Sequence, residues 1–146
     1  MVRSTELSTK ALIAAMRQGD FYASSGVVLD DIRFESGTLH IRIRAEPGVT
    51  YETRIVGTPK DFDAGTRDLA SPPGDPHPMR TDYSADVGRT FATIAGTEIN
   101  YALTGKEHYV RAVITSSQSH PNPSYEGQHQ MAWTQPVGWR GSSPKK

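Results

Sequence analysis

The stretch 108-HYVRAVITSS-117 has the clearest strand pattern of the chain. Side chains alternate between the two faces of an extended chain, so every second residue shares a face. The more polar face carries Tyr109, Arg111, Val113 and Thr115, and the other face carries Val110, Ala112 and Ile114. A period of two with one apolar face predicts a β-strand that lies against a hydrophobic core.

Similar strand patterns recur on both sides of this stretch. They are 27-VVLDDIRF-34, 39-LHIRIRA-45, 50-TYETRIVGT-58, 89-RTFATI-94, 98-EINYALTG-105 and 129-HQMAWTQPVGW-139. Glycine-containing turn signals separate several of them. The prolines in 59–82 exclude a central strand, so we expect an ordered loop or excursion there and a second loop over 118–128. Short strands at this spacing predict a mainly β fold, an antiparallel β-sandwich that is Ig-like or jelly-roll-like.

A single helix is expected ahead of the strands, in 8-STKALIAAMRQGD-20. Ser8 suits the N-cap, and Gly19 suits the position just past the C-terminal end. The apolar residues at helical spacing are Ala11, Leu12, Ala15 and Met16. A helix this short persists only when it docks on other structure. We therefore expect one β-sandwich domain over residues 1–140 with a leading helix at 8–18, followed by a disordered tail at 141–146.

The composition argues against several classes of function. The 146 residues include 16 basic and 16 acidic side chains, so no net field steers the chain to nucleic acid or acidic lipid. No cysteine is present, which removes thiolate metal ligands and thiol nucleophiles. The apolar runs are too short to cross a bilayer, and no signal peptide is visible. We expect no cofactor, no nucleic-acid or membrane partner and, by default, a cytoplasmic location.

The tract 21-FYASSG-26 raises the question of a serine nucleophile. Such a serine needs a base and an orienting acid within hydrogen-bond reach, and a nucleophile elbow runs from a strand into a helix. Here the order is helix then strand, and the flanking glycines of that motif are absent. We interpret Ser24 and Ser25 as residues that permit a tight turn and satisfy local backbone groups.

Two segments together resemble one known family. The segment 11-ALIAAMRQGDFYASSGVVLDDI-32 resembles a helix of the form aLraGrfYaStG, which occurs late in PHP-superfamily (polymerase and histidinol phosphatase) metallophosphoesterases and leads into a small all-β region. The closing pattern of those proteins, yvRvev.d…aWsnPiw, is similar to 108-HYVRAVITS-116 followed by 131-MAWTQPVGW-139. The matched positions are Tyr109, Val110, Arg111, Ala132, Trp133, Pro136 and Trp139.

The resemblance implies a non-catalytic accessory β domain. The family's chemistry uses metal ions held in an N-terminal barrel by His-x-His and by a late Asp-x-His that precedes the helix. This chain has no His-x-His, and its Asp75-Pro76-His77 follows the helix, in the wrong order. The implied partner is a metallophosphoesterase domain upstream or a copy of the chain itself. The implied interface, where we expect an exposed apolar patch, consists of Leu12, Met16, Phe21 and Tyr22.

A carbohydrate-binding module is the first alternative. Sugar rings stack on exposed aromatic side chains whose polar neighbours bond the hydroxyls. Trp139 and Tyr125 lie near loops and are the better candidates, whereas Trp133 lies inside a strand and is expected in the core. Arg111 is a further binding candidate, but an ion pair across strands is the favoured role. The acids considered for that pair are Glu98 and Asp86.

A small metal-dependent hydrolase is the second alternative. His120 and His129 flank one loop with Glu126 nearby, a set that could converge on a metal. Asp75 and His77 offer another pair for the same chemistry. The loop 60-KDFDAGTRD-68 has carboxylates for calcium, but its glycine is misplaced for an EF-hand. Those carboxylates are Asp61, Asp63 and Asp68. Solvated loop or rim positions are the favoured interpretation of all these residues, and we expect no metal.

Overall fold

The computed structural model describes residues 1–70, 73 and 79–139. Its helix is α1 (Thr9–Gln18). The strands are β1 (Tyr22–Ser24), β2 (Leu29–Glu35), β3 (Thr38–Ile43), β4 (Tyr51–Pro59), β5 (Thr66–Ala70), β6 (Met79–Tyr83), β7 (Arg89–Ala95), β8 (Glu98–Ala102), β9 (Glu107–Ser119) and β10 (His129–Thr134). The strand pairs are antiparallel. The expected mainly β, antiparallel architecture with one short N-terminal helix is confirmed.

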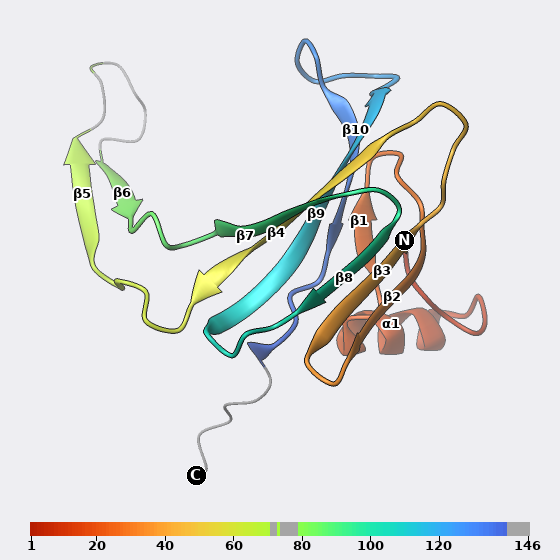
Figure 1. Cartoon of the computed structure of the whole chain (residues 1–146), viewed down its shortest axis with the longest axis horizontal. Coiled ribbons are helices and arrows are strands. Elements are labelled where there is room, and N and C mark those ends of the chain that lie inside the picture. The colour runs from red at the N-terminus through yellow and green to blue at the C-terminus, as the bar shows by residue number, and fades with distance from the viewer. Residues whose placement is uncertain (71–72, 74–78, 140–146) are drawn as a thin grey trace.

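Two sheets pack face to face and form a β-sandwich (Figure 1). The larger sheet has the strand order β1-β10-β9-β4-β7, and the smaller sheet has the order β2-β3-β8. β9 is the central strand of the larger sheet, with β4 on one side and β10 on the other. The chain passes between the sheets after β1, β3, β7 and β8, so the two layers are linked several times.

The core lies between the two sheets. β9 contributes Val110, Ala112 and Ile114 to it, and β3 contributes Leu39, Ile41 and Ile43. Full burial of a side chain of valine size or larger stabilises a fold by about 1.5–3 kcal/mol. The remaining alternate positions of β9 point away from this core. We call that side of β9 and its neighbours the outer face of the larger sheet.

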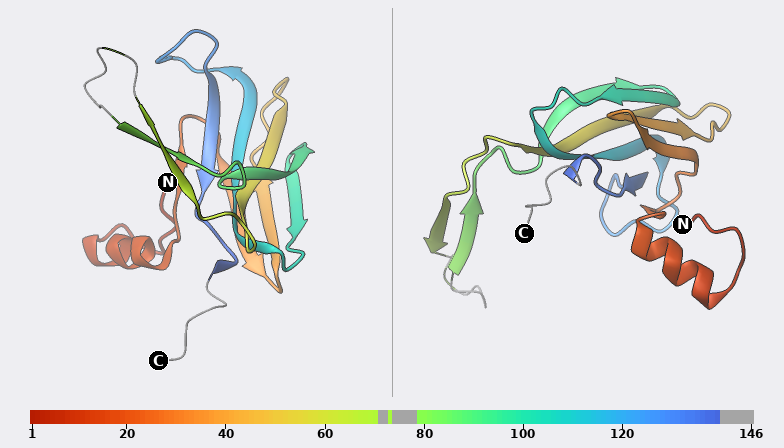
Figure 2. Two further views of the ribbon diagram at one scale, coloured as in Figure 1. Left: turned by 90° about the vertical axis from the view of Figure 1, so that its left-hand side faces the viewer. Right: turned by 90° about the horizontal axis from the view of Figure 1, so that it is seen from below.

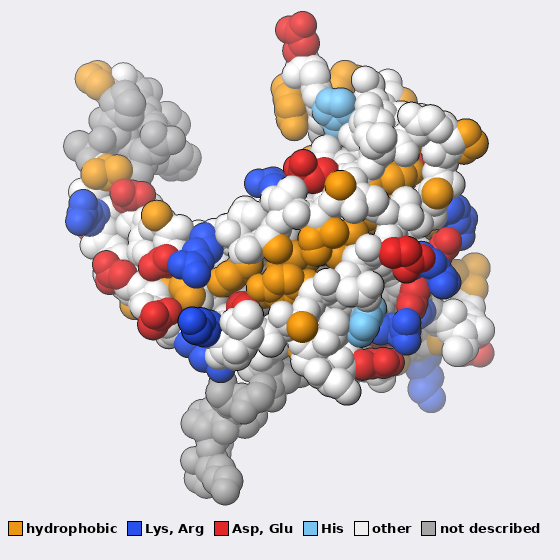
Figure 3. Space-filling model, in the orientation of Figure 1, with side chains coloured by type: hydrophobic (Ala, Val, Ile, Leu, Met, Phe, Trp, Pro, Cys, Tyr) orange, Lys and Arg blue, Asp and Glu red, His pale blue; other side chains and the backbone are white. Residues whose placement is uncertain are grey.

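The smaller sheet leaves part of the larger sheet uncovered. Figure 3 shows apolar side chains in a band across the middle of the face seen in Figure 1. Residues packed against the core but only partly buried include Phe91, Ile94, Tyr101 and Leu103. The guanidinium of Arg89 lies 4.9 Å from the centre of the Phe91 ring and covers it in part.

α1 has the caps that the sequence predicts. Ser8 Oγ accepts a hydrogen bond from the Ala11 N–H at 3.2 Å. Gly19 adopts φ +83°, a left-handed conformation that favours glycine, and ends the helix. Ala15 is the buried residue of the helix. Figure 2 shows α1 beside the sandwich, not between its sheets.

β5 and β6 form a hairpin that projects from the sandwich (Figures 1 and 2). Its register runs from Thr66 opposite Tyr83 to Ala70 opposite Met79. The excursion predicted over 59–82 therefore contains two strands that were not predicted, because TRDLA and MRTDY are short and mostly polar. Asp75 and the nearby His77 lie outside the described residues, as does the tail 141–146.

Candidate functional site

Ser24 and Ser25 join β1 to β10 and to the turn before β2. Ser24 Oγ donates to the Val27 carbonyl at 2.6 Å and accepts from the Gly26 N–H at 3.0 Å. The Ser25 N–H donates to the Met131 carbonyl at 2.9 Å, and Ser25 Oγ accepts from the Met131 N–H at 3.0 Å. Both hydroxyls satisfy backbone groups, as the sequence predicts.

The outer face of the larger sheet brings together several residues that the sequence singled out. Trp133 of β10 lies opposite Val113 of β9. Arg111 lies two positions from Val113 on the same face of β9. Trp133 is half-buried, and because its neighbour Ala132 faces the core, Trp133 lies on the outer face and not in the core, where it was expected.

A shallow recess forms where the chain after β10 returns to the start of β9. The Val137 N–H donates to the Val110 carbonyl at 2.8 Å, and the Val110 N–H donates back at 3.0 Å. This contact places residues 136–139 beside the first residues of β9. The side chains around the resulting recess, which has a volume of about 270 Å³, are His108, Tyr109, Pro136 and Trp139. Trp139 is 49% exposed, so a ligand can reach its indole next to a phenol ring.

Arg111 and Arg54 place positive charge on the outer face. Arg54 of β4 lies opposite Val113, and Arg111 lies opposite Val56 of β4. Both arginines are exposed. Neither forms an ion pair with a residue in the described part of the chain.

The ion-pair partners considered for Arg111 lie elsewhere. Asp86 pairs with Arg89, with 3.2 Å between Oδ1 and Nη1. Glu98 is part of β8 and lies opposite Arg42 in the smaller sheet. The pairing favoured for Arg111 from the sequence is therefore wrong, because these acids lie on other surfaces.

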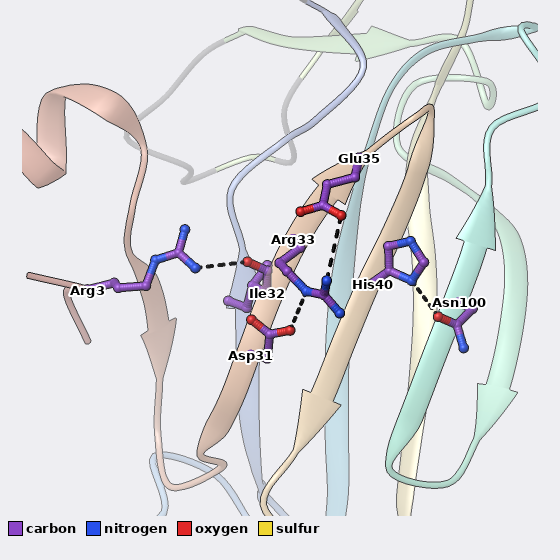
Figure 4. Close-up of polar contacts among 7 residues, drawn as sticks. All are labelled: Arg3, Asp31, Ile32, Arg33, Glu35, His40 and Asn100. Carbon is purple, nitrogen blue, oxygen red and sulfur yellow. Dashed lines mark hydrogen bonds and ion pairs between the residues drawn. The ribbon is translucent and has the colours of Figure 1, made fainter.

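On the outer face of the smaller sheet, several charged groups are paired with one another, unlike Arg111 and Arg54 of the larger sheet (Figure 4). Arg33 Nε lies 2.6 Å from Asp31 Oδ2, and Arg33 Nη1 lies 3.6 Å from Glu35 Oε2. The hydrogen bond and charge of Asp31 raise the pKa of the Arg33 guanidinium. His40 Nδ1 and Asn100 Oδ1 are hydrogen-bonded at 2.6 Å. The charged side chains drawn in Figure 4 therefore already have partners within the protein.

Tyr125 lies far from Trp139 along the β9–β10 hairpin. It is 63% exposed and belongs to the loop that joins the two strands, at the top of Figure 1. The recess at Trp139 lies where β9 begins and β10 has ended. The two aromatic residues favoured for carbohydrate binding are therefore not brought together.

α1 presents an exposed apolar stripe to solvent. Ile13 is 46% exposed and Met16 is 52% exposed. Leu12 is half-buried and lies one helical turn before Met16. Leu7, just before the helix, is 93% exposed. We call Leu12, Ile13 and Met16 the α1 stripe.

The two aromatic residues after α1 differ from each other. Phe21 is half-buried and forms an isolated β-bridge with Val2. Tyr22 is 8% exposed, and its hydroxyl accepts from the Leu29 N–H at 3.0 Å. The Tyr22 side chain belongs to the core of its own fold, so it is not available as the partner contact that the sequence suggested.

The residues considered as metal ligands do not converge. Among the described residues, no three His, Asp or Glu side chains gather in one place. Asp63 Oδ1 accepts from the Gly65 N–H at 2.8 Å, and Asp68 lies on β5 opposite Thr81. Asp61 lies in the turn after β4. His120 Nδ1 accepts from the Asn122 N–H at 3.1 Å, and His129 lies opposite Ser119.

A buried carboxylate, Glu107, stands at the start of β9. It is 3% exposed and accepts from Tyr101 Oη at 2.9 Å, from Thr104 Oγ1 at 3.0 Å and from the Thr104 N–H at 3.0 Å. Burial acts to raise the pKa of Glu107, but these hydrogen bonds and one from its own backbone outweigh it and lower that pKa. Burial and then the bond to Glu107 raise the pKa of Tyr101 to about 12.

Sequence reasoning missed His108 and Pro136 as residues of the recess and Arg54 as a residue of the outer face. Alternation within 50-TYETRIVGT-58 was a signal for Arg54, because its strand neighbours are apolar or small. No local signal places Pro136 beside His108, since that contact depends on the pairing of residues distant in sequence.

Comparison with models of known protein families, with curated protein sequences and with solved structures finds no match for this chain. Within the part that the structure describes, no helix is both long and apolar enough to cross a membrane. Function is therefore inferred from the residues and their geometry.

Proposed function

We propose that this chain is a non-catalytic accessory β-sandwich domain and that the α1 stripe is its contact surface for a neighbouring protein domain. The carrying observation is the exposure of Ile13 and Met16, at 46% and 52%, on a short helix. The resemblance to the C-terminal β region of PHP-type metallophosphoesterases supports the catalytic domain of such an enzyme as the partner.

The fold holds α1 while Ile13 and Met16 of the stripe stay exposed. Ala15 is the buried helix residue. Other contacts come from the segments around the helix, since Arg3 pairs with Asp20 at 3.1 Å and the Met1 amino group donates to the Tyr22 carbonyl at 2.9 Å. Burial of an exposed Ile or Met side chain contributes about 1.5–3 kcal/mol. The stripe therefore keeps this free energy available for a partner.

The charge of α1 indicates the chemistry of that partner. Lys10 and Arg17 are its charged residues, and the helix contains no acid. An amphipathic helix docks with its apolar face in a groove, and charges around the groove select the partner. A matching surface has an apolar groove with an acidic rim.

Isothermal titration of the full chain into a PHP-type catalytic domain prepared without its own C-terminal β region tests the proposal. We expect binding, and we expect Ile13→Glu and Met16→Glu each to weaken it by roughly thirtyfold or more, as for the anchor residues of an interface. Leu69→Glu is the matched control, because Leu69 is a 49% exposed apolar residue on β5. Its affinity should equal that of the unmodified chain.

Sedimentation of the chain alone completes the test. A homodimer dispersed by Ile13→Glu would identify a second copy as the occupant of the stripe. The absence of both heteromeric binding and self-association would contradict the proposal, as would equal losses in the stripe variants and in Leu69→Glu.

The chain should also fail to hydrolyse p-nitrophenyl phosphate with Mn²⁺ or Zn²⁺ added, and reproducible turnover would contradict the non-catalytic role.

A further inference from the structure

We propose that the outer face of β9 and β10 binds an acidic oligosaccharide, with a sugar ring in the recess at Trp139 and a ligand carboxylate on Arg111. This site uses none of the residues of the α1 stripe. It goes beyond the proposed accessory role, and either proposal can fail without the other.

The recess has the composition of a sugar subsite. An indole offers a flat apolar surface to the C–H face of a sugar ring, and Trp139 is 49% exposed. Pro136 and Tyr109 provide further apolar walls, and the exposed His108 provides imidazole nitrogens for hydroxyl groups. Tyr109 Oη accepts from Thr58 Oγ1 at 3.4 Å, which leaves its own O–H to donate to a ligand.

Positive charge continues from the recess along the same face. Arg111 follows Tyr109 by two positions of β9, about 7 Å along the strand. Arg54, on the adjacent strand, lies opposite Val113, two positions further. Guanidinium groups bind carboxylates through paired N–H donors. Spaced arginines beside a sugar subsite match a chain that repeats its carboxylates, as polyuronates do.

The same residues discriminate against other ligands. Arg111 and Arg54 have no acidic partner among the described residues, so a carboxylate supplies the missing charge, whereas a neutral sugar does not. The half-buried Trp133 on β10 lies opposite Val113, on the other side of β9 from Arg54, and extends the aromatic surface of this face. The formal net charge of the chain is +0, and a protein without excess positive charge is not typical of those that hold nucleic acid through its phosphates.

Isothermal titration of the full chain with oligogalacturonate, oligoalginate and oligohyaluronate tests the site. Methyl-esterified oligogalacturonate is the neutral control, because it has the same sugar backbone without the charge. We expect binding of at least one acidic oligosaccharide, weaker binding as NaCl rises, and at least about tenfold weaker binding of the ester than of its acid. No binding of any acidic oligosaccharide, equal affinity for acid and ester, or tighter binding of single-stranded DNA would overturn the proposal.

Variants then locate the binding. Arg111→Gln should weaken acid binding by roughly 10–100-fold, the range for lost charge-assisted hydrogen bonds, and leave ester binding unchanged. Trp139→Ala should weaken both by about tenfold. Arg42→Gln and Tyr125→Ala are matched controls on other surfaces and should bind as the unmodified chain does. Arg111 is exposed, so its variant reports on the site even where Trp139→Ala unfolds. Full affinity in Arg111→Gln, or an equal loss in the controls, would overturn the assignment.

Discussion

The β4–β9 pair and α1 are built in opposite ways. On β4 and β9, Ile55 and Ile114 are fully buried, each 0% exposed, and the two strands are paired along the whole of β4. α1 buries Ala15 and leaves Ile13 and Met16 about half exposed. The strands obtain their stability from the sandwich, whereas the helix lies at its side with an apolar face unused. Apolar residues in the two regions therefore serve different purposes, the first folding and the second, we infer, association.

Gly57→Ala in the β4–β9 pair should cause the largest loss in the free energy of unfolding. A Cβ at Gly57 would overlap the backbone carbonyl of Tyr109 on β9. Because backbone cannot move aside as a side chain can, we expect a loss of at least about 3 kcal/mol in the free energy of unfolding. Urea titration followed by circular dichroism measures it. Gly48→Ala is the control, because Gly48 has φ +75° but no atom lies near the position of an added Cβ. This substitution should lower the free energy of unfolding by about 1 kcal/mol.

Glu107→Ala should produce the next largest effect, at the start of β9. It leaves the Tyr101 hydroxyl and the Thr104 N–H without their acceptor, and we expect a loss of about 2–3 kcal/mol. The lowered pKa of Glu107 in the folded state means that its contribution is present above its unfolded pKa and is lost as pH falls through the folded value. The difference in unfolding free energy between the wild type and Glu107→Gln should therefore shrink in acid. A constant difference from pH 7 to pH 3 would contradict this assignment.

Thr53→Val should stabilise the packed region. Thr53 is 0% exposed, and its Oγ1 has no hydrogen-bond partner among the described residues. Valine has nearly the same shape and no hydroxyl to desolvate, so we expect a gain of about 1 kcal/mol. The urea midpoint should rise at unchanged slope. A fall in the midpoint would show that the hydroxyl has a partner in solution, such as a buried water.

Met16→Gln on α1 should produce the smallest effect on stability. The side chain is 52% exposed, so its replacement should change the free energy of unfolding by less than about 0.5 kcal/mol. Differential scanning calorimetry of the full chain measures the change. A loss comparable with that of Glu107→Ala would show that α1 docks on its own sandwich, which would remove the contrast and the proposed interface with it.

Much of the fold follows from local sequence patterns. Alternation identified β9 and its inward face of Val110, Ala112 and Ile114, and the helix bounds followed from Ser8 and Gly19. Alternation did not identify β5 and β6, which are short and mostly polar and whose described side chains are exposed. Trp133 was also misplaced. An aromatic residue inside a strand suggests burial in the core, but residue type alone does not say which face of the sheet the side chain occupies.

The candidate sites were predictable only in part. Helical periodicity is a local signal and predicted Leu12 and Met16 of the α1 stripe, but it did not include Ile13 and did not show which of these side chains are exposed. Arg111 was placed correctly on the more polar face of its strand, but the ion pair favoured for it requires a neighbouring acid that the sheet order puts elsewhere. The recess depends on the Val110–Val137 contact, which no local pattern indicates.

The sequence by itself determined the kinds of element, their order and which side of each strand is apolar, because these follow from periods of a few residues and from capping and turn chemistry. The tertiary structure decided which strands are neighbours. That order left Arg111 and Arg54 without an ion pair among the described residues and brought Pro136 and Trp139 beside Tyr109. It also buried Tyr22 and left Ile13 and Met16 exposed. Side chains far apart in sequence meet only when the whole chain packs, so a site composed of such neighbours is a property of the packed fold.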